Sequence, residues 1–111
     1  MNRIKVADRY PFPGPRYRTL EKGAQGNSSS SGEDFRDWIE DELRKSESLT
    51  IDLDGTVGYG SSFLEEAFGG LIRAGYASEI VLGIELISFE EPELIDEIKK
   101  YINDAIALRG D

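Results

Sequence analysis

The chain has 111 residues, of which 39% are hydrophobic and 32% are charged, and its formal net charge is −9. This length fits a single domain with one modest core, and the composition is that of a chain that folds. The sequence contains no cysteine and no histidine, which excludes disulfides, thiol chemistry, the usual structural zinc sites and mechanisms with an imidazole base. We therefore expect a non-enzymatic protein with no metal and no cofactor.

The charge is unevenly distributed. Residues 1–22 carry six Lys and Arg against two acids, whereas residues 23–111 carry seven against twenty. Because most of the chain would repel a phosphate backbone, we expect no nucleic-acid partner and favour a basic protein partner. No apolar run approaches the roughly 20 residues that a membrane helix needs. The N-terminus also lacks the apolar stretch of a secretory signal, so we expect a cytoplasmic protein without membrane contact.

The N-terminal residues 1–25 are expected to form an antiparallel hairpin. RIKVADRY (3–10) predicts a first strand, and PFPGP (11–15) predicts a turn because proline fixes φ and glycine permits positive φ. RYRTLEKG (16–23) then predicts the second strand. A flexible, Ser-rich loop is expected over 26–33, inside one domain that spans the whole chain.

The middle of the chain predicts a strand between two amphipathic helices. Helical spacing of apolar residues predicts a first helix over 32–45, and Ser30 or Ser31 with an acid three residues later forms a capping-box pattern. SLTIDL (48–53) predicts a central strand, and a second helix is expected over about 62–75. The residues expected to be buried on the two helices are Phe35, Trp38, Ile39, Leu43, Phe63, Ala67, Phe68, Leu71 and Ile72.

The last part of the chain predicts one more strand and one more helix. EIVLGIELI (79–87) is a continuous apolar run, typical of a strand covered on both faces. A third helix is expected to begin near Pro92, since proline is allowed in a first turn. The buried stripe expected on it is Leu94, Ile95, Ile98, Tyr101, Ile102, Ala105 and Ile106. The order β-β-α-β-α-β-α implies an α/β fold with a mixed sheet and helices packed on it.

The segment IDLDGTV (51–57) raises an enzymatic alternative. Taken alone, it resembles the opening motif of the haloacid-dehalogenase-like phosphatases, in which two aspartates act beside magnesium. That resemblance implies a nucleophilic Asp52 and an acid–base Asp54, whose side chains would point to the same side of a strand. The later lysine and second acidic pair of that family have no counterpart at a strand end here. A small magnesium-dependent phosphatase is the alternative to a non-catalytic role.

The longer stretch LTIDLDGTVGYGSSFLEEAFGGLIR (49–73) resembles the central strand, turn and helix of STAS domains, the fold of the anti-sigma-factor antagonists. Counted from Asp52, Ser62 matches the serine that a partner kinase phosphorylates in those antagonists. The acidic residue before the serine pair is Gly60 in this chain, and the glycine after it is Phe63. The predicted element order agrees with the STAS fold along almost the whole chain.

A closer resemblance is to the STAS-like family of bacterial domains. Members carry a Ser-Gly-Glu-x-Phe-Arg motif before the first helix, and here SGEDFR supplies Ser31, Gly32, Glu33, Phe35 and Arg36. They also carry a motif that this chain matches with SSFLEE (61–66) and AFGGL (67–71). The resemblance implies a regulatory domain that binds another protein, and a histidine-kinase-like ATPase as the partner class.

Two roles for Ser62 remain open at this stage. With Glu65 three residues later it forms a capping-box pattern, which is worth about 1 kcal/mol and is reason enough for a serine. The same helix start also accommodates a phosphate, which would change a docking surface sharply.

A third role for the turn, nucleotide binding, has little support because the turn lacks the lysine of a phosphate-binding loop. The candidate partner-binding and phosphorylation residues are Tyr59, Gly60, Ser61, Ser62, Phe63, Glu65 and Glu66. The oligomeric state is left open.

Overall fold

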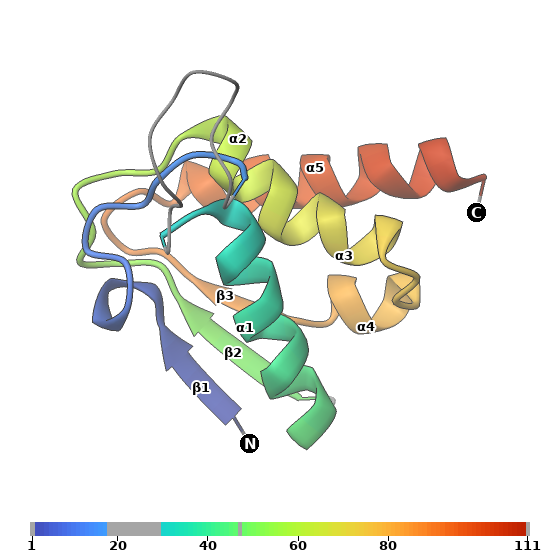
Figure 1. Ribbon diagram of the computed structural model, residues 1–111, viewed down its shortest axis with the longest axis horizontal. Helices are drawn as coiled ribbons and strands as arrows, with labels where there is room; N and C mark the ends of the chain where they lie inside the picture. The colour runs from blue at the N-terminus through green and yellow to red at the C-terminus, as the bar shows by residue number, and fades with distance from the viewer. Residues whose placement is uncertain (1, 18–29, 47, 111) are drawn as a thin grey trace.

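The computed structural model describes residues 2–17, 30–46 and 48–110 and has an α/β fold (Figure 1). The α/β class expected from the sequence is confirmed. The order of the elements differs from the expected one at two places, near the N-terminus and before the last strand. Within the described segments, no helix has the length and apolar character needed to cross a membrane.

Three strands form one parallel sheet in the order β1-β2-β3. They are β1 (Asn2–Lys5), β2 (Leu49–Asp52) and β3 (Glu85–Ile87). The described strands therefore make a parallel sheet and not the mixed sheet that we expected. The central strand β2 falls inside the predicted range 48–53 and is buried at all four positions, in agreement with its apolar, β-branched sequence.

The two faces of this sheet differ in polarity. Ile4 and Ile51 stand in register and are buried. Alternate side chains point to opposite faces, so the neighbouring row of Arg3, Thr50 and Glu85 lies on the other side. There Arg3 and Glu85 are exposed, and the Thr50 hydroxyl hydrogen-bonds to Glu85 at 3.0 Å. Right-handed crossovers between strands in this order place the connecting helices on one face, which leaves the other face polar.

The three predicted helices are found close to their expected positions, and the structure adds a short 3-10 turn η1 (Val6–Asp8) near the N-terminus and α4 (Ser78–Leu82). The other helices are α1 (Gly32–Lys45), α2 (Ser61–Leu64), the π-helical turn η2 (Glu65–Gly69), α3 (Gly70–Arg73) and α5 (Glu93–Arg109). Because α2, η2 and α3 follow one another without a break, they form one continuous helix over 61–73. The π turn inside it was not predicted. The predicted helix from Pro92 is confirmed as α5.

The predicted N-terminal hairpin is wrong where the structure describes it. β1 ends at Lys5, η1 follows, and β1 pairs in parallel with β2 instead of with a neighbouring antiparallel strand. The backbone of 14–16 bonds to the start of α1: Gly32 N–H donates to the carbonyl of Pro15 at 2.8 Å. The remainder of the predicted second strand, 18–23, lies outside the described residues. The predicted strand is too long because Val6 and Tyr10 are both buried, but the turn η1 and not a strand connects them.

Two further predictions are corrected. The apolar run 79–87 is not one strand: α4 occupies its first part and only Glu85–Ile87 joins the sheet. A short apolar run does not by itself distinguish a strand from a buried helical turn, and Val81 is buried on α4 while Leu82 is exposed. The predicted loop 26–33 is wrong at its end, where Gly32 already belongs to α1; residues 26–29 lie outside the described part.

An aromatic cluster fills the core between α1 and the helix 61–73. Phe35 stacks on Phe63 with ring centroids 5.5 Å apart, and it meets Phe68 edge to face at 5.7 Å. Tyr10 packs edge to face against Phe35 and is only 1% exposed. Trp38 is half-buried, and the guanidinium of Arg9 lies 4.1 Å from its ring centroid.

Gly32 lets the start of α1 approach the helix 61–73 closely. A Cβ on Gly32 would lie 2.5 Å from the backbone oxygen of Phe63 and 3.0 Å from the Cβ of Glu66. Backbone atoms do not move aside as a flexible side chain does, so only glycine fits at this crossing. The glycine of the SGEDFR motif is therefore a packing requirement.

The substitution Gly32→Ala tests this close approach. We expect it to lower the free energy of unfolding by about 2 kcal/mol or more, because the helices must separate to admit a methyl group. Urea denaturation followed by circular dichroism measures the change. Gly60→Ala is the matched control: Gly60 has ordinary φ and nothing within 4 Å of an added Cβ, so we expect a clearly smaller loss, limited to the poorer N-cap preference of alanine. Equal losses in the two variants would contradict the packing argument.

Candidate functional site

The turn between β2 and α2 occupies residues 53–60 and is held in place by its own hydrogen bonds. The Tyr59 hydroxyl donates to the carbonyl of Leu53 at 2.7 Å. Val57 N–H donates to the carbonyl of Pro11 at 3.1 Å, which ties the turn to the N-terminal segment. Burial raises the pKa of Tyr59 above its ordinary value, so the hydroxyl stays a neutral donor at physiological pH. Gly58 has a φ of 140°, which glycine adopts without strain.

The serine pair stands exposed at the end of this turn. Ser61 and Ser62 are the first two residues of α2, and the N-cap position is Gly60, with no side-chain hydrogen bond to the helix. The predicted Ser62–Glu65 capping box is therefore wrong. The reason is tertiary, because the carboxylate of Glu65 faces two arginines and does not reach back to the backbone.

Ser61 lies close to Tyr101 on α5. Burial and the hydrogen bond to Glu97, 2.6 Å long, raise the pKa of Tyr101 to about 12, and a hydrogen bond with Ser61 acts in the opposite direction. The start of α2 is thereby placed against α5. Ser62 has no such contact in the described part of the chain.

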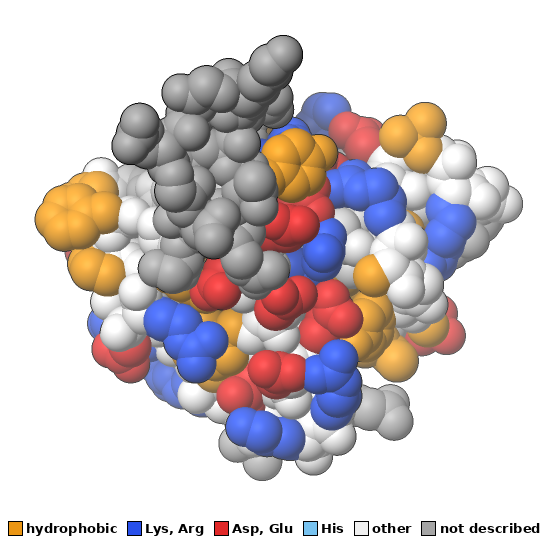
Figure 2. All heavy atoms as spheres, in the orientation of Figure 1, with side chains coloured by type: hydrophobic (Ala, Val, Ile, Leu, Met, Phe, Trp, Pro, Cys, Tyr) orange, Lys and Arg blue, Asp and Glu red, His pale blue; other side chains and the backbone are white. Residues whose placement is uncertain are grey.

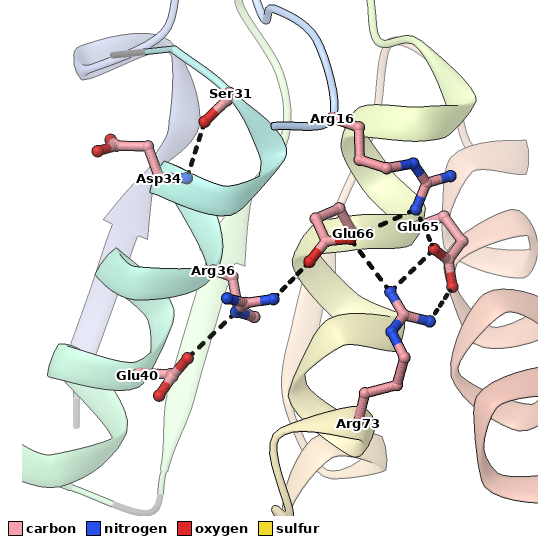
Figure 3. Close-up of polar contacts among 8 residues, drawn as sticks. All are labelled: Arg16, Ser31, Asp34, Arg36, Glu40, Glu65, Glu66 and Arg73. Carbon is pink, nitrogen blue, oxygen red and sulfur yellow. Dashed lines mark hydrogen bonds and ion pairs between the residues drawn. The ribbon is translucent and has the colours of Figure 1, made fainter. Parts of the chain in front are cut away.

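Three arginines from three segments meet two consecutive glutamates behind the serine pair (Figure 3). Arg16 lies 2.5 Å from Glu65 and 3.4 Å from Glu66. Arg73, one turn beyond η2, lies 2.7 Å from Glu65 and 3.3 Å from Glu66. Arg36 reaches across from α1 and hydrogen-bonds to Glu66. We call these five residues the Arg–Glu cluster.

Ion pairs with arginines offset the cost of burying the two glutamates of the cluster. Glu66 is 5% exposed, and a buried carboxylate without partners would be strongly destabilising. Burial alone would raise the pKa of Glu65, but the hydrogen bonds from Arg73 and Arg16 outweigh it and lower the pKa. The same hydrogen bonds from Glu65 raise the pKa values of Arg16 and Arg73. Glu65, Arg16 and Arg73 are therefore charged at neutral pH.

Glycines and the π turn make room for the cluster. η2 begins at the two glutamates and ends at Gly69, and Gly70 follows. A Cβ on Gly69 would lie 2.3 Å from a carboxylate oxygen of Glu65, and one on Gly70 would lie 2.9 Å from Cδ of Arg36. The Gly-Gly pair thus leaves the space that these long side chains occupy. π turns inside α-helices occur often at functional sites.

The SGEDFR motif lies at the start of α1, which faces the helix 61–73 across the Arg–Glu cluster. Ser31 caps α1, since its hydroxyl accepts from Asp34 N–H at 3.0 Å, which confirms the predicted cap. Glu33 N–H donates to the carbonyl of Arg16 at 2.9 Å, and Phe35 lies in the core. Arg36 reaches Glu66 and lies 3.3 Å from Glu40. The two sequence motifs form one unit in space.

Comparison with known protein families identifies the family of the chain. A family model described as a STAS-like domain of unknown function (DUF4325) matches residues 31–94. The chain belongs to this STAS-like family. The match begins at the motif serine Ser31 and spans both motifs, β2, the turn and β3. No curated protein and no solved structure shows significant similarity to the chain.

The structure separates the candidate residues of this STAS-like domain into two groups. Gly60, Ser61 and Ser62 are exposed, and Tyr59 is half-buried. Phe63, Glu65 and Glu66 face inward: Phe63 is fully buried, and the two glutamates belong to the Arg–Glu cluster. The inward group positions the turn, so only the outward group is available to a partner in this conformation.

Sequence reasoning missed Arg16 and Arg73 as members of the site. Arg16 lies in an irregular, proline-rich segment where no periodicity indicates a partner. The spacing of Arg73 from Glu65 exceeds the three or four residues of an ordinary helix pair, and the π turn between them carries the contact. The charges around Glu66 were therefore not predictable from local spacing.

Asp52 and Asp54 have structural roles. Asp52 lies 3.4 Å from the guanidinium of Arg3 and accepts from Asp54 N–H at 3.0 Å. Asp54 accepts from Phe89 N–H and Glu90 N–H at 3.1 and 2.9 Å, so it ties the turn to the segment before α5. Among the described residues, no three acidic side chains stand together as a group that could hold a metal ion.

A pH experiment tests the Arg–Glu cluster. Because the pKa of Glu65 is lower in the folded state than its ordinary 4.5, its stabilising contribution is present above pH 4.5 and is lost as the pH falls through the folded-state pKa. We expect the free energy of unfolding to fall less steeply on acidification in Glu65→Gln than in the unmodified chain. Urea denaturation at a series of pH values measures it. Glu91→Gln, at an exposed position, should keep the original slope; identical slopes in all three proteins would exclude the assignment.

A second substitution tests the role of Asp54. Asp54→Ala removes the acceptor for two backbone N–H groups, and we expect it to lower the free energy of unfolding by about 1–2 kcal/mol. Thermal denaturation checks this, with Asp8→Ala, exposed on η1, as the control. Unchanged stability together with loss of a magnesium-dependent phosphate-ester hydrolysis would instead favour the phosphatase alternative.

Proposed function

We propose that this STAS-like domain is a non-catalytic regulator that binds a protein partner through the exposed turn and helix start at 58–62. The observation that carries the proposal is the exposure of Ser61 and Ser62 at a helix start that they do not cap. Ser61 contacts Tyr101, whereas the hydroxyl of Ser62 has no partner within the described part of the chain and is available for recognition. The family membership supports a regulatory interaction domain as the general class.

We further propose that the partner is a histidine-kinase-like ATPase and that phosphorylation of Ser62 regulates its binding. Free N–H groups and the positive end of the dipole at a helix start favour a phosphate there. The nearby glutamates do not oppose it strongly, because Arg16, Arg36 and Arg73 neutralise them. A phosphate adds about −1.5 to −2 charges and would alter the partner surface. This partner class implies a bacterial, cytoplasmic setting.

A binding experiment with matched serine variants tests this proposal. The partner to use is the histidine-kinase-like ATPase encoded nearest to this chain, with affinities measured by calorimetry. We expect Ser62→Ala to retain binding and Ser62→Asp to weaken it about tenfold, which corresponds to about 1.4 kcal/mol. Ser48→Asp is the control, since Ser48 is exposed before β2, at the opposite end of the strand.

Mass spectrometry after incubation with the ATPase and ATP completes the test. A phosphopeptide that disappears in Ser62→Ala supports Ser62 as the regulated residue. Phosphorylation that persists in this variant would move the site to Ser61 or elsewhere. Absence of binding to the ATPase by the unmodified chain would reject the proposed partner class.

A further inference from the structure

Three large apolar side chains project into solvent from the loops at one end of the sheet. Val57 is 72% exposed, Phe12 is 69% exposed and Phe89 is 84% exposed. Each belongs to a different loop. Phe12 lies in the N-terminal segment after η1, Val57 in the turn after β2, and Phe89 in the segment between β3 and α5. Figure 1 shows these three loops side by side beyond the carboxyl ends of the strands, and apolar side chains protrude at that end in Figure 2.

Hydrogen bonds fix the three loops relative to one another. Val57 N–H bonds to the carbonyl of Pro11, next to Phe12. The carboxylate of Asp54 accepts from Phe89 N–H, and Gly55 N–H donates to Glu90 Oε1 at 2.8 Å. These apolar side chains therefore stand on an ordered platform. An ordered platform reduces the entropy that a binding partner must overcome.

The surroundings of the three side chains are acidic. Glu90, Glu91 and Glu93 are exposed beside Phe89, and no ion pair to their side chains occurs within the described segments. Two basic side chains of the described residues on this side are already engaged: Lys5 lies 3.9 Å from Asp52, and Arg9 stacks on the Trp38 ring. A partner that covers the apolar side chains therefore meets uncompensated negative charge.

We propose that Phe12, Val57 and Phe89 form a docking surface for a protein segment that presents apolar side chains between Lys or Arg residues. Exposed apolar groups with a polar rim are typical of interaction sites, and opposite charges select among partners that are equally apolar. A second copy of this chain would bring together two acidic rims on molecules of net charge −9, and an anionic membrane would be repelled in the same way. This surface borders the turn 58–62, so the inference rests on the proposed function and adds the chemistry of the partner.

Selection from a random-peptide phage library against the full chain tests the docking surface without the ATPase. We expect enriched peptides to combine aromatic or aliphatic residues with Lys or Arg, and their affinity to fall with rising salt. Binding of the enriched peptides should fall at least about tenfold in the double variant Val57→Ser/Phe89→Ser. Leu108→Ser is the matched control, because Leu108 is 88% exposed near the end of α5 and lies outside this surface. The substituted side chains are exposed, and circular dichroism confirms that each variant is folded.

Several results would overturn the inference. The first is a selection that enriches acidic peptides or enriches no peptide. The others are peptide binding that persists in the double variant, and a loss of peptide binding in Leu108→Ser as large as in the double variant. Self-association in sedimentation experiments that the double variant abolishes would assign the surface to a second copy, and vesicle binding that it abolishes would assign it to lipid. If peptides bind as expected while the ATPase does not bind, the docking surface stands and the proposed partner class fails.

Discussion

The arrangement of this domain depends on one buried charge, the carboxylate of Glu66. It is 5% exposed, and Arg16, Arg36 and Arg73 approach it from the N-terminal segment, from α1 and from α3. Removal of a carboxylate from water is expensive, so Glu66 is tolerated only while its partners stay in place. Three segments far apart in sequence are thereby held to one geometry, and the glycines at 32, 69 and 70 keep the room that this geometry needs.

The exposure of the serine pair follows from the ion pairs of the two glutamates behind it. Because Glu65 and Glu66 are engaged with arginines, the helix 61–73 starts at a fixed position with its first two serines in solvent. The preceding turn is anchored by Tyr59 and by the carboxylate of Asp54. Rigid support behind an exposed surface lowers the entropy that a partner must overcome on binding.

The elements with strong local patterns were predictable. The first helix was expected over 32–45 and is found as Gly32–Lys45, since its apolar stripe and the cap by Ser31 agree with each other. The central strand and α5 were also expected. The prediction failed for residues 79–87, where a short apolar run fits both a helical turn and a strand, and at the N-terminus, where a strand pairs with a distant partner.

The sequence by itself determined the α/β class and the exclusion of thiol and imidazole chemistry, because these depend on composition and on local spacing. Its two motifs carried the resemblance to the STAS-like family. Tertiary structure alone decided the structural role of each residue in the segment GYGSSFLEEAFGGL (58–71). Glu65 does not cap the helix but pairs with Arg16 and Arg73, Phe63 is buried, and Ser62 is left exposed. The physical reason is that ion pairs and close packing join residues tens of positions apart, and such contacts leave no periodic pattern in the sequence.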